Sequence, residues 1–267
     1  MNPKEEFTRV PMVERANIVE KWRPSDTEEQ YQIAKIKFPT NYGPNDIEYR
    51  NNNRGYRCDD FDLWENYRYR IVFAGSSDTE GVGLPLEHCW AKVMHKMICD
   101  KLGQKIPYWN IAVGGTGTDQ MVRYLYHEGN ILRPQVVISY LPFLERRERW
   151  HNDRWILSSE YTKTDRDAKK LFVDKRYIEY QTEKNFTMIS LLMEKWKGIF
   201  IYNTNEILYN EQQLMLPRIV KKTVSPVLQD YLDHARDGVH AGPISHRTFA
   251  ESMFEQSWSI IKEQFDA

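Results

Sequence analysis

A short apolar run that ends abruptly in small residues constrains the fold more than any other stretch. Residues 71–74 are rich in β-branched and aromatic side chains, and Gly75, Ser76 and Ser77 follow directly. Over residues 84–103 the apolar positions recur at intervals of three and four, which is typical of an amphipathic helix. The sequence therefore predicts a buried strand, a tight turn carrying two serines, and then a helix.

The alternation of strand and helix continues along the chain. Further strands are predicted at residues 106–113, 134–141 and 198–202. Further helices are predicted at residues 121–129, 165–196 and 245–265. Because strands alternating with helices form a parallel sheet covered on both faces, we expect an α/β fold. The mixed stretch 206–230 is expected to be irregular.

Composition excludes several classes of protein. The chain has 267 residues and a net charge of −1, which gives no field to attract nucleic acid or an anionic membrane. No run of about 18 apolar residues is present, and the N-terminus lacks the apolar core of a signal peptide. Three cysteines without metal-type spacing predict reduced thiols. We expect a soluble protein, cytoplasmic or part of a larger assembly, without metal or cofactor.

Residues 1–66 differ from the rest of the chain in being polar and rich in proline and asparagine. Short helices are predicted at residues 13–21 and 26–36. The segment carries many aromatic residues, so we expect it to pack on a main domain of residues 67–267. Binding to a second copy or to an assembly partner is the alternative use of such an arm.

Two features carry candidate chemistry. A serine at the carboxyl end of a parallel strand lies where open α/β sheets bind ligands. Asp237 and His240, three residues apart in a glycine-containing loop, suit a carboxylate that orients an imidazole. Taken singly, each feature has an ordinary alternative. The serines can serve as turn or capping residues, and Asp237 and His240 can be ordinary surface residues. His246 is a rival base.

Together these stretches resemble the SGNH/GDSL hydrolases. Residues 75–81, GSSDTEG, resemble the GDSxTxG block of this family. Residues 110–115, NIAVGG, resemble its second block, and residues 237–240, DGVH, resemble its C-terminal DxxH block. The resemblance implies a three-layer α/β/α sandwich with a flavodoxin-like parallel sheet, in a branch with an N-terminal extension. It also implies Ser77 as the nucleophile, with His240 as base, Asp237 as orienter, and the Ser77 and Gly115 N–H groups as the oxyanion hole.

The chain departs from the family pattern at two places. Ser76 replaces the aspartate that precedes the nucleophile. After the third strand Phe143 falls near the position of the oxyanion asparagine, and the next asparagine is Asn152. Losing one such donor costs about 10²–10³ in rate. Arg146, Arg147 or Asn152 is expected to replace it, or else this loop is a solvated charged face.

The resemblance implies hydrolysis of an ester by a serine esterase or deacylase. Aromatic residues mixed with charged ones suit stacking on sugar rings, which favours an O-acetylated carbohydrate, although packing in the core or in covering loops is the commoner use of such residues. The aromatic residues in question are Tyr140, Phe143, Trp150 and Trp155. The predicted substrate-binding residues are Asp78, Phe143, Arg146 and Asn152. The alternatives are a non-catalytic glycan-binding or assembly module, and an O-acyltransferase.

Overall fold

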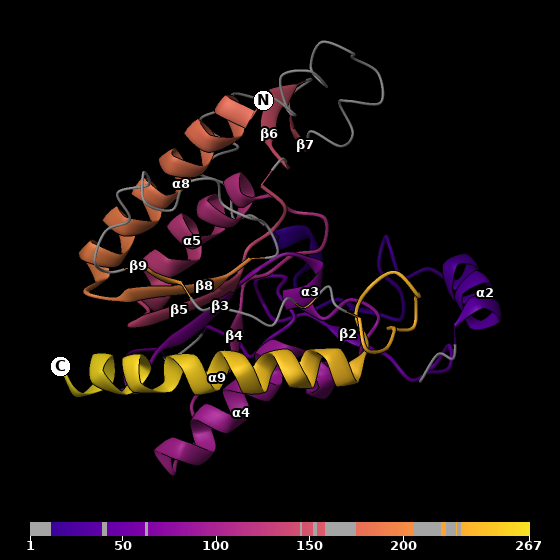
Figure 1. Ribbon diagram of the computed structural model, residues 1–267, viewed down its shortest axis with the longest axis horizontal. Helices are drawn as coiled ribbons and strands as arrows, with labels where there is room; N and C mark the ends of the chain where they lie inside the picture. The colour runs from indigo at the N-terminus through magenta and orange to yellow at the C-terminus, as the bar shows by residue number, and fades with distance from the viewer. Residues whose placement is uncertain are drawn as a thin grey trace.

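A parallel sheet between two layers of helices forms the centre of the protein (Figure 1). The computed structural model describes residues 12–38, 42–61, 64–144, 146–151, 154–157, 175–204, 220–222, 228 and 231–267. Five strands form the sheet, in the order β4-β3-β5-β8-β9. They are β3 (Ile71–Gly75), β4 (Trp109–Asn110), β5 (Val136–Tyr140), β8 (Ile199–Asn203) and β9 (Val220–Lys222).

All neighbouring strands of this sheet run parallel. Numbered among themselves along the chain, the strands have the order 2-1-3-4-5, which is the flavodoxin-like arrangement. The three-layer α/β/α sandwich expected from the sequence is therefore confirmed.

The two faces of the sheet bury separate apolar cores. Side chains alternate across a strand, so Val72 and Ala74 of β3 point to one face while Ile71 and Phe73 point to the other. The first face is covered by α5 (Thr118–Leu132) and α8 (Lys175–Trp196). The second is covered by α4 (Trp90–Leu102) and α9 (Pro243–Asp266). Figure 1 shows the two helix pairs on opposite sides of the strands.

The central strands end level with one another at the edge where the site lies. Gly75, Tyr140 and Asn203 are partners across β3, β5 and β8. The short helix α3 (Ser77–Glu80) begins directly beyond Gly75, so the two serines of the turn lie at the carboxyl edge of the sheet. This is the edge at which ligands bind in open α/β sheets.

Several predicted elements have other bounds in the structure. The strand expected at residues 106–113 is only two residues long, and the helix expected to end near Gly129 continues to Leu132. The charged segment after β5 holds an antiparallel hairpin, β6 (Glu148–His151) and β7 (Arg154–Leu157), that was not predicted. Part of the stretch expected to be irregular forms β9. A single-turn 3₁₀ helix, η3 (Leu86–His88), precedes α4.

The N-terminal segment contains short elements. They are η1 (Val13–Arg15), β1 (Val19–Glu20), α2 (Glu28–Lys37), β2 (Tyr49–Arg50) and η2 (Trp64–Asn66). The prediction of a helix at residues 13–21 was wrong, because β1 pairs with β2 there, whereas α2 matches the second predicted helix. Tyr56 and Phe61 belong to the apolar core beneath α5. The division of the chain after residue 66 stays a prediction.

Candidate active site

Ser77 is the first residue of α3 and is 8% exposed. The turn before it requires a glycine, because a Cβ on Gly75 would lie 2.2 Å from the Thr79 hydroxyl. Gly81 ends the helix in the left-handed conformation at a φ of 78°. Asn110 then holds the turn, since its side-chain amide donates to the Thr79 carbonyl at 2.6 Å. Strand, glycine and asparagine together fix the position of the serine.

Asp237 and His240 form a hydrogen-bonded pair in the loop before α9. His240 Nδ1 lies 2.5 Å from Asp237 Oδ2, and the other oxygen of Asp237 accepts from the backbone N–H groups of Val239 and His240. Gly238, at a φ of +66°, provides the tight turn. The carboxylate is fully buried, and its two backbone bonds hold it against the imidazole. This geometry leaves Nε2 as the reactive nitrogen of His240.

The pKa of His240 reflects opposing effects. Burial disfavours the imidazolium and lowers the pKa, while the hydrogen bond and the charge of Asp237, with a further contribution from Asp78, raise it. The pKa ends above its ordinary value of 6.5. A base with such a pKa is strong enough to take a proton from a hydroxyl group.

The segment that follows the helix of Ser77 lies against the loop of Asp237 and His240. Arg236 donates its backbone N–H to the Gly83 carbonyl at 3.0 Å, and a Cβ on Gly83 would lie 3.3 Å from Asp237 Oδ1. Asp78, the residue after Ser77, interacts electrostatically with both His240 and Asp237. Burial raises the pKa of Asp78 above its ordinary value. The structure thus brings these two distant stretches of the sequence together at one edge of the sheet.

Two backbone N–H groups at this edge are available to a ligand. Within the described residues, neither Ser77 nor Gly115 donates its N–H to a protein acceptor. Gly115 is exposed and adopts a φ of +82°, a conformation that favours glycine. Gly114 lies beside the serine, since a Cβ built there would be 3.6 Å from Ser77 Cβ.

Arg146 approaches the nucleophile turn from the loop after β5. Its Nη1 lies 3.4 Å from Ser76 Oγ, and its guanidinium stacks on the Phe143 ring, 4.6 Å from the ring centre. Arg147 is buried elsewhere, donating to the Ile178 carbonyl in α8. Asn152 lies outside the described residues. Of the two expected substitutes that the structure describes, Arg146 lies beside Ser76 and Arg147 does not.

Two further expectations are resolved differently. The Tyr140 ring is buried against Phe249 in the core, so it is no platform for a sugar. The side chains of Trp150 and Trp155 lie outside the described residues. His246 is fully buried and accepts from the Trp90 N–H through Nδ1 at 3.0 Å. Burial lowers its pKa to about 3, so it is a core histidine and not the partner of Asp237.

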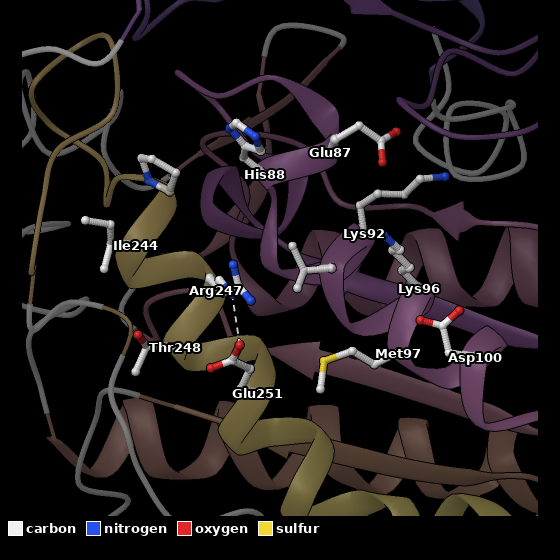
Figure 2. A pocket seen from close by; sticks show the side chains of 12 residues that line it. Glu87, His88, Lys92, Lys96, Met97, Asp100, Ile244, Arg247, Thr248 and Glu251 are labelled. Carbon is white, nitrogen blue, oxygen red and sulfur yellow. Dashed lines mark hydrogen bonds and ion pairs between the residues drawn. The ribbon is translucent and has the colours of Figure 1, made fainter.

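A separate groove opens between α4 and α9, with a cavity volume of about 770 Å³. Figure 2 shows Lys92 and Lys96 on one wall and Arg247, paired with Glu251, on the other. None of the residues proposed for catalysis lines this groove.

Nowhere in the described ranges do three His, Cys, Asp or Glu side chains gather as metal ligands. No helix in the described ranges is both long and apolar enough to span a bilayer.

Sequence reasoning missed the polar side chains behind the site. Glu80 accepts from the Gly114 N–H at 2.5 Å, and the Tyr49 hydroxyl accepts from the Gly83 N–H at 2.8 Å. The sequence signal is weak, because the Gly114 donor lies in the second matched block but the Gly83 donor lies two residues beyond the first. Nothing in the sequence links Tyr49 to them.

The chain resembles solved esterase structures over nearly three-quarters of its length. TesA shares 13% identity at a TM-score of 0.46, covering 73% of this chain and 98% of its own. The psychrotrophic esterase EstA from Pseudoalteromonas sp. shares 11% identity at a TM-score of 0.45, covering 72% of this chain and 98% of its own. A GDSL-like lipase from Bacteroides thetaiotaomicron shares 15% identity at a TM-score of 0.39, covering 76% of this chain and 99% of its own. No family model and no curated protein matches the chain.

Proposed function

We propose that the chain is a serine ester hydrolase of the SGNH type. Ser77 attacks the ester carbonyl, His240 accepts its proton and passes it to the leaving alcohol, and Asp237 orients the imidazole. Water, giving its proton to His240, then attacks the acyl–Ser77 ester, which releases the acid as the serine takes the proton back. The observation that carries the proposal is the buried Asp237–His240 pair, whose loop lies against the segment that follows the helix of Ser77. The chemistry proposed requires no metal or cofactor.

The oxyanion of the tetrahedral intermediate is proposed to bind the Ser77 and Gly115 N–H groups. Their lack of protein acceptors within the described residues supports this role. We assign the third donor to Arg146, whose guanidinium lies at Ser76 and carries a charge that suits a developing oxyanion. The arginine would take the place of the asparagine that the family pattern has after the third strand.

The substrate is proposed to be a small or carbohydrate ester. Asp78 is a half-buried carboxylate that follows Ser77 directly and interacts electrostatically with His240, which suits it to accept from a hydroxyl group of the substrate. Phe143, half-buried beneath Arg146, offers an apolar surface beside it. These residues suit an ester of a polar alcohol, such as an O-acetylated sugar, better than a long-chain lipid ester.

Ester hydrolysis by matched variants tests this proposal. Ser77→Ala is expected to lower kcat by about 10⁶-fold, as for other triad serines. Arg146→Ala is expected to lower kcat by about 10²-fold, and Arg146→Lys to recover part of this, because one oxyanion donor is at stake. Arg247→Ala, an exposed arginine on α9, is the control. Equal rates for the wild type and Ser77→Ala would contradict the proposal.

A substrate panel separates the finer alternatives. Acetylated sugars are expected to be cleaved faster than long-chain lipid esters, and preference for long chains would oppose the sugar assignment. Product analysis with a second sugar present distinguishes hydrolysis from O-acyl transfer. A glycan-binding module, which the absent oxyanion asparagine favours, would bind the acetylated sugar equally before and after Ser77→Ala and release no acetate.

A further inference from the structure

Two arginines of the N-terminal segment contact the last residue of the helix that begins at Ser77. Arg15 donates through Nη2 to Glu80 Oε1 at 2.9 Å, and Arg23 Nε lies 3.1 Å from the same oxygen. Glu80 follows Ser77 by three residues and is 2% exposed. Both arginines precede the first strand of the sheet by about 50 residues or more. A buried carboxylate of the catalytic helix is therefore paired with the arm.

The second oxygen of Glu80 reaches the oxyanion region. Glu80 Oε2 accepts from the Gly114 N–H at 2.5 Å, and a Cβ on Gly114 would lie 3.1 Å from that oxygen. The next residue is Gly115, whose N–H we assign to the oxyanion hole. The Gly114 N–H is part of the rigid Val113–Gly114 peptide, so this bond anchors the backbone one residue before the Gly115 N–H and leaves only the φ and ψ angles of Gly114 between the two.

The ion pairs keep Glu80 charged. Burial alone would raise the pKa of its carboxyl group, but Arg15, Arg23 and the Gly114 N–H more than offset this and hold the pKa below its ordinary value. An ionised carboxylate makes a stronger hydrogen bond to a backbone N–H than a neutral amide does. The arm thus determines how firmly the Gly114 amide is held.

The same segment also holds the base loop. Asp26 forms a bidentate ion pair with Arg236. Nε of the arginine donates to Oδ1 at 3.0 Å and Nη2 donates to Oδ2 at 2.5 Å, and both side chains are buried. Gln30 of α2 donates to the Asp237 carbonyl at 3.1 Å. The arm therefore contacts the nucleophile helix and the loop of the base through separate side chains.

We propose that Glu80, held by Arg15 and Arg23, is a positioning residue for the oxyanion hole, so that the N-terminal arm is part of the catalytic apparatus. The proposal rests on the proposed serine hydrolase function. We assign neither the arginines nor Glu80 a contact with the reacting atoms. Each acts through the Val113–Gly114 peptide, which precedes the Gly115 N–H.

The test compares Glu80→Gln with Glu128→Gln. Glu128 of α5 also forms a buried ion pair with the arm, through Arg54 at 2.7 Å, but it does not touch Gly114 or the base loop. Kinetics on p-nitrophenyl acetate should show kcat lowered by about 10–10²-fold with KM unchanged in Glu80→Gln. Glu128→Gln should lose stability and keep kcat. Arg15→Ala, at a half-buried position, should lower kcat in the same way if Glu80→Gln does not fold.

Hydrogen exchange provides a readout that does not depend on activity. The peptide covering residues 111–118 should exchange faster in Glu80→Gln and Arg15→Ala than in the wild type or Glu128→Gln. Unchanged exchange, or unchanged kcat in an active enzyme, overturns the positioning role. A wild type without esterase activity but with the expected exchange would instead refute the proposed function alone.

Discussion

At the scale of single residues, the site depends on how neighbouring groups set the charge of His240. The imidazole is buried, yet Asp237 makes its protonated form more favourable than in water. As the proposed base, His240 acts only when neutral. The rate should therefore rise with pH as His240 loses its proton.

The pH profile of kcat/KM checks this assignment. In the wild type the midpoint should lie above 6.5, the ordinary pKa of histidine, because Asp237 raises the pKa. Asp237→Asn removes that charge, so the midpoint should move to lower pH while kcat falls by about 10⁴-fold. A midpoint unmoved by Asp237→Asn would show that another group titrates.

His246 should behave as a structural residue. His246→Ala leaves the buried Trp90 N–H without its acceptor, which is expected to cost about 1–3 kcal/mol of the free energy of unfolding. Urea denaturation measures that loss. Reaction with a serine-directed phosphonate should persist in the folded variant, and its disappearance would instead support His246 as the base.

The contact between Asp237 and His240 could be predicted from the sequence, but its surroundings could not. Asp237 and His240 are close in the chain, so their spacing already indicates contact. Arg146 and Glu80 make contacts with distant segments. The direction in which such a long side chain points depends on the fold of the surrounding backbone. For that reason Arg147, adjacent in sequence, has an entirely different environment.

At the scale of elements, the helices α5 and α8 meet through Gly129. The sequence suggests that a glycine ends the helix, yet α5 continues because the Trp196 ring packs on that glycine. A Cβ there would lie 2.2 Å from the ring. The hairpin β6–β7 and the short strand β9 were missed for a related reason, since pairing with another segment, and not local pattern, defines them.

Gly129→Ala should therefore destabilise the protein although alanine favours helix. Overpacking against Trp196 is expected to cost about 1–3 kcal/mol, which exceeds the gain of about 1 kcal/mol in helix propensity. A double-mutant cycle with Trp196→Leu should give a non-additive free energy of unfolding. Additive effects would argue that the two residues do not press on each other.

At the scale of the whole molecule, the alternation of strands and helices is enough to predict the sandwich, because a parallel sheet needs cover on both faces. The aromatic content of the arm likewise indicates packing. The charged side chains that join the arm to the site give no sequence signal. Asp26 and Arg236 are separated by 210 residues and meet only in the folded chain.

The Asp26–Arg236 pair should matter for stability. Asp26→Asn leaves Arg236 buried without its counter-charge, and we expect a loss of about 3–5 kcal/mol in the free energy of unfolding. Replacing both, as Asp26→Leu with Arg236→Met, should cost less than Asp26→Asn alone. Urea denaturation of the three proteins measures the order, and a double variant less stable than the single one would contradict this account.

The most direct test of the central claim is the intact mass of the protein after reaction with a fluorophosphonate. The wild type should gain one adduct, and Ser77→Ala and His240→Ala should gain none, because the reagent reports a serine activated by its base. An unmodified, folded wild type, or an adduct that persists in Ser77→Ala, would contradict the assignment of this site as a serine hydrolase.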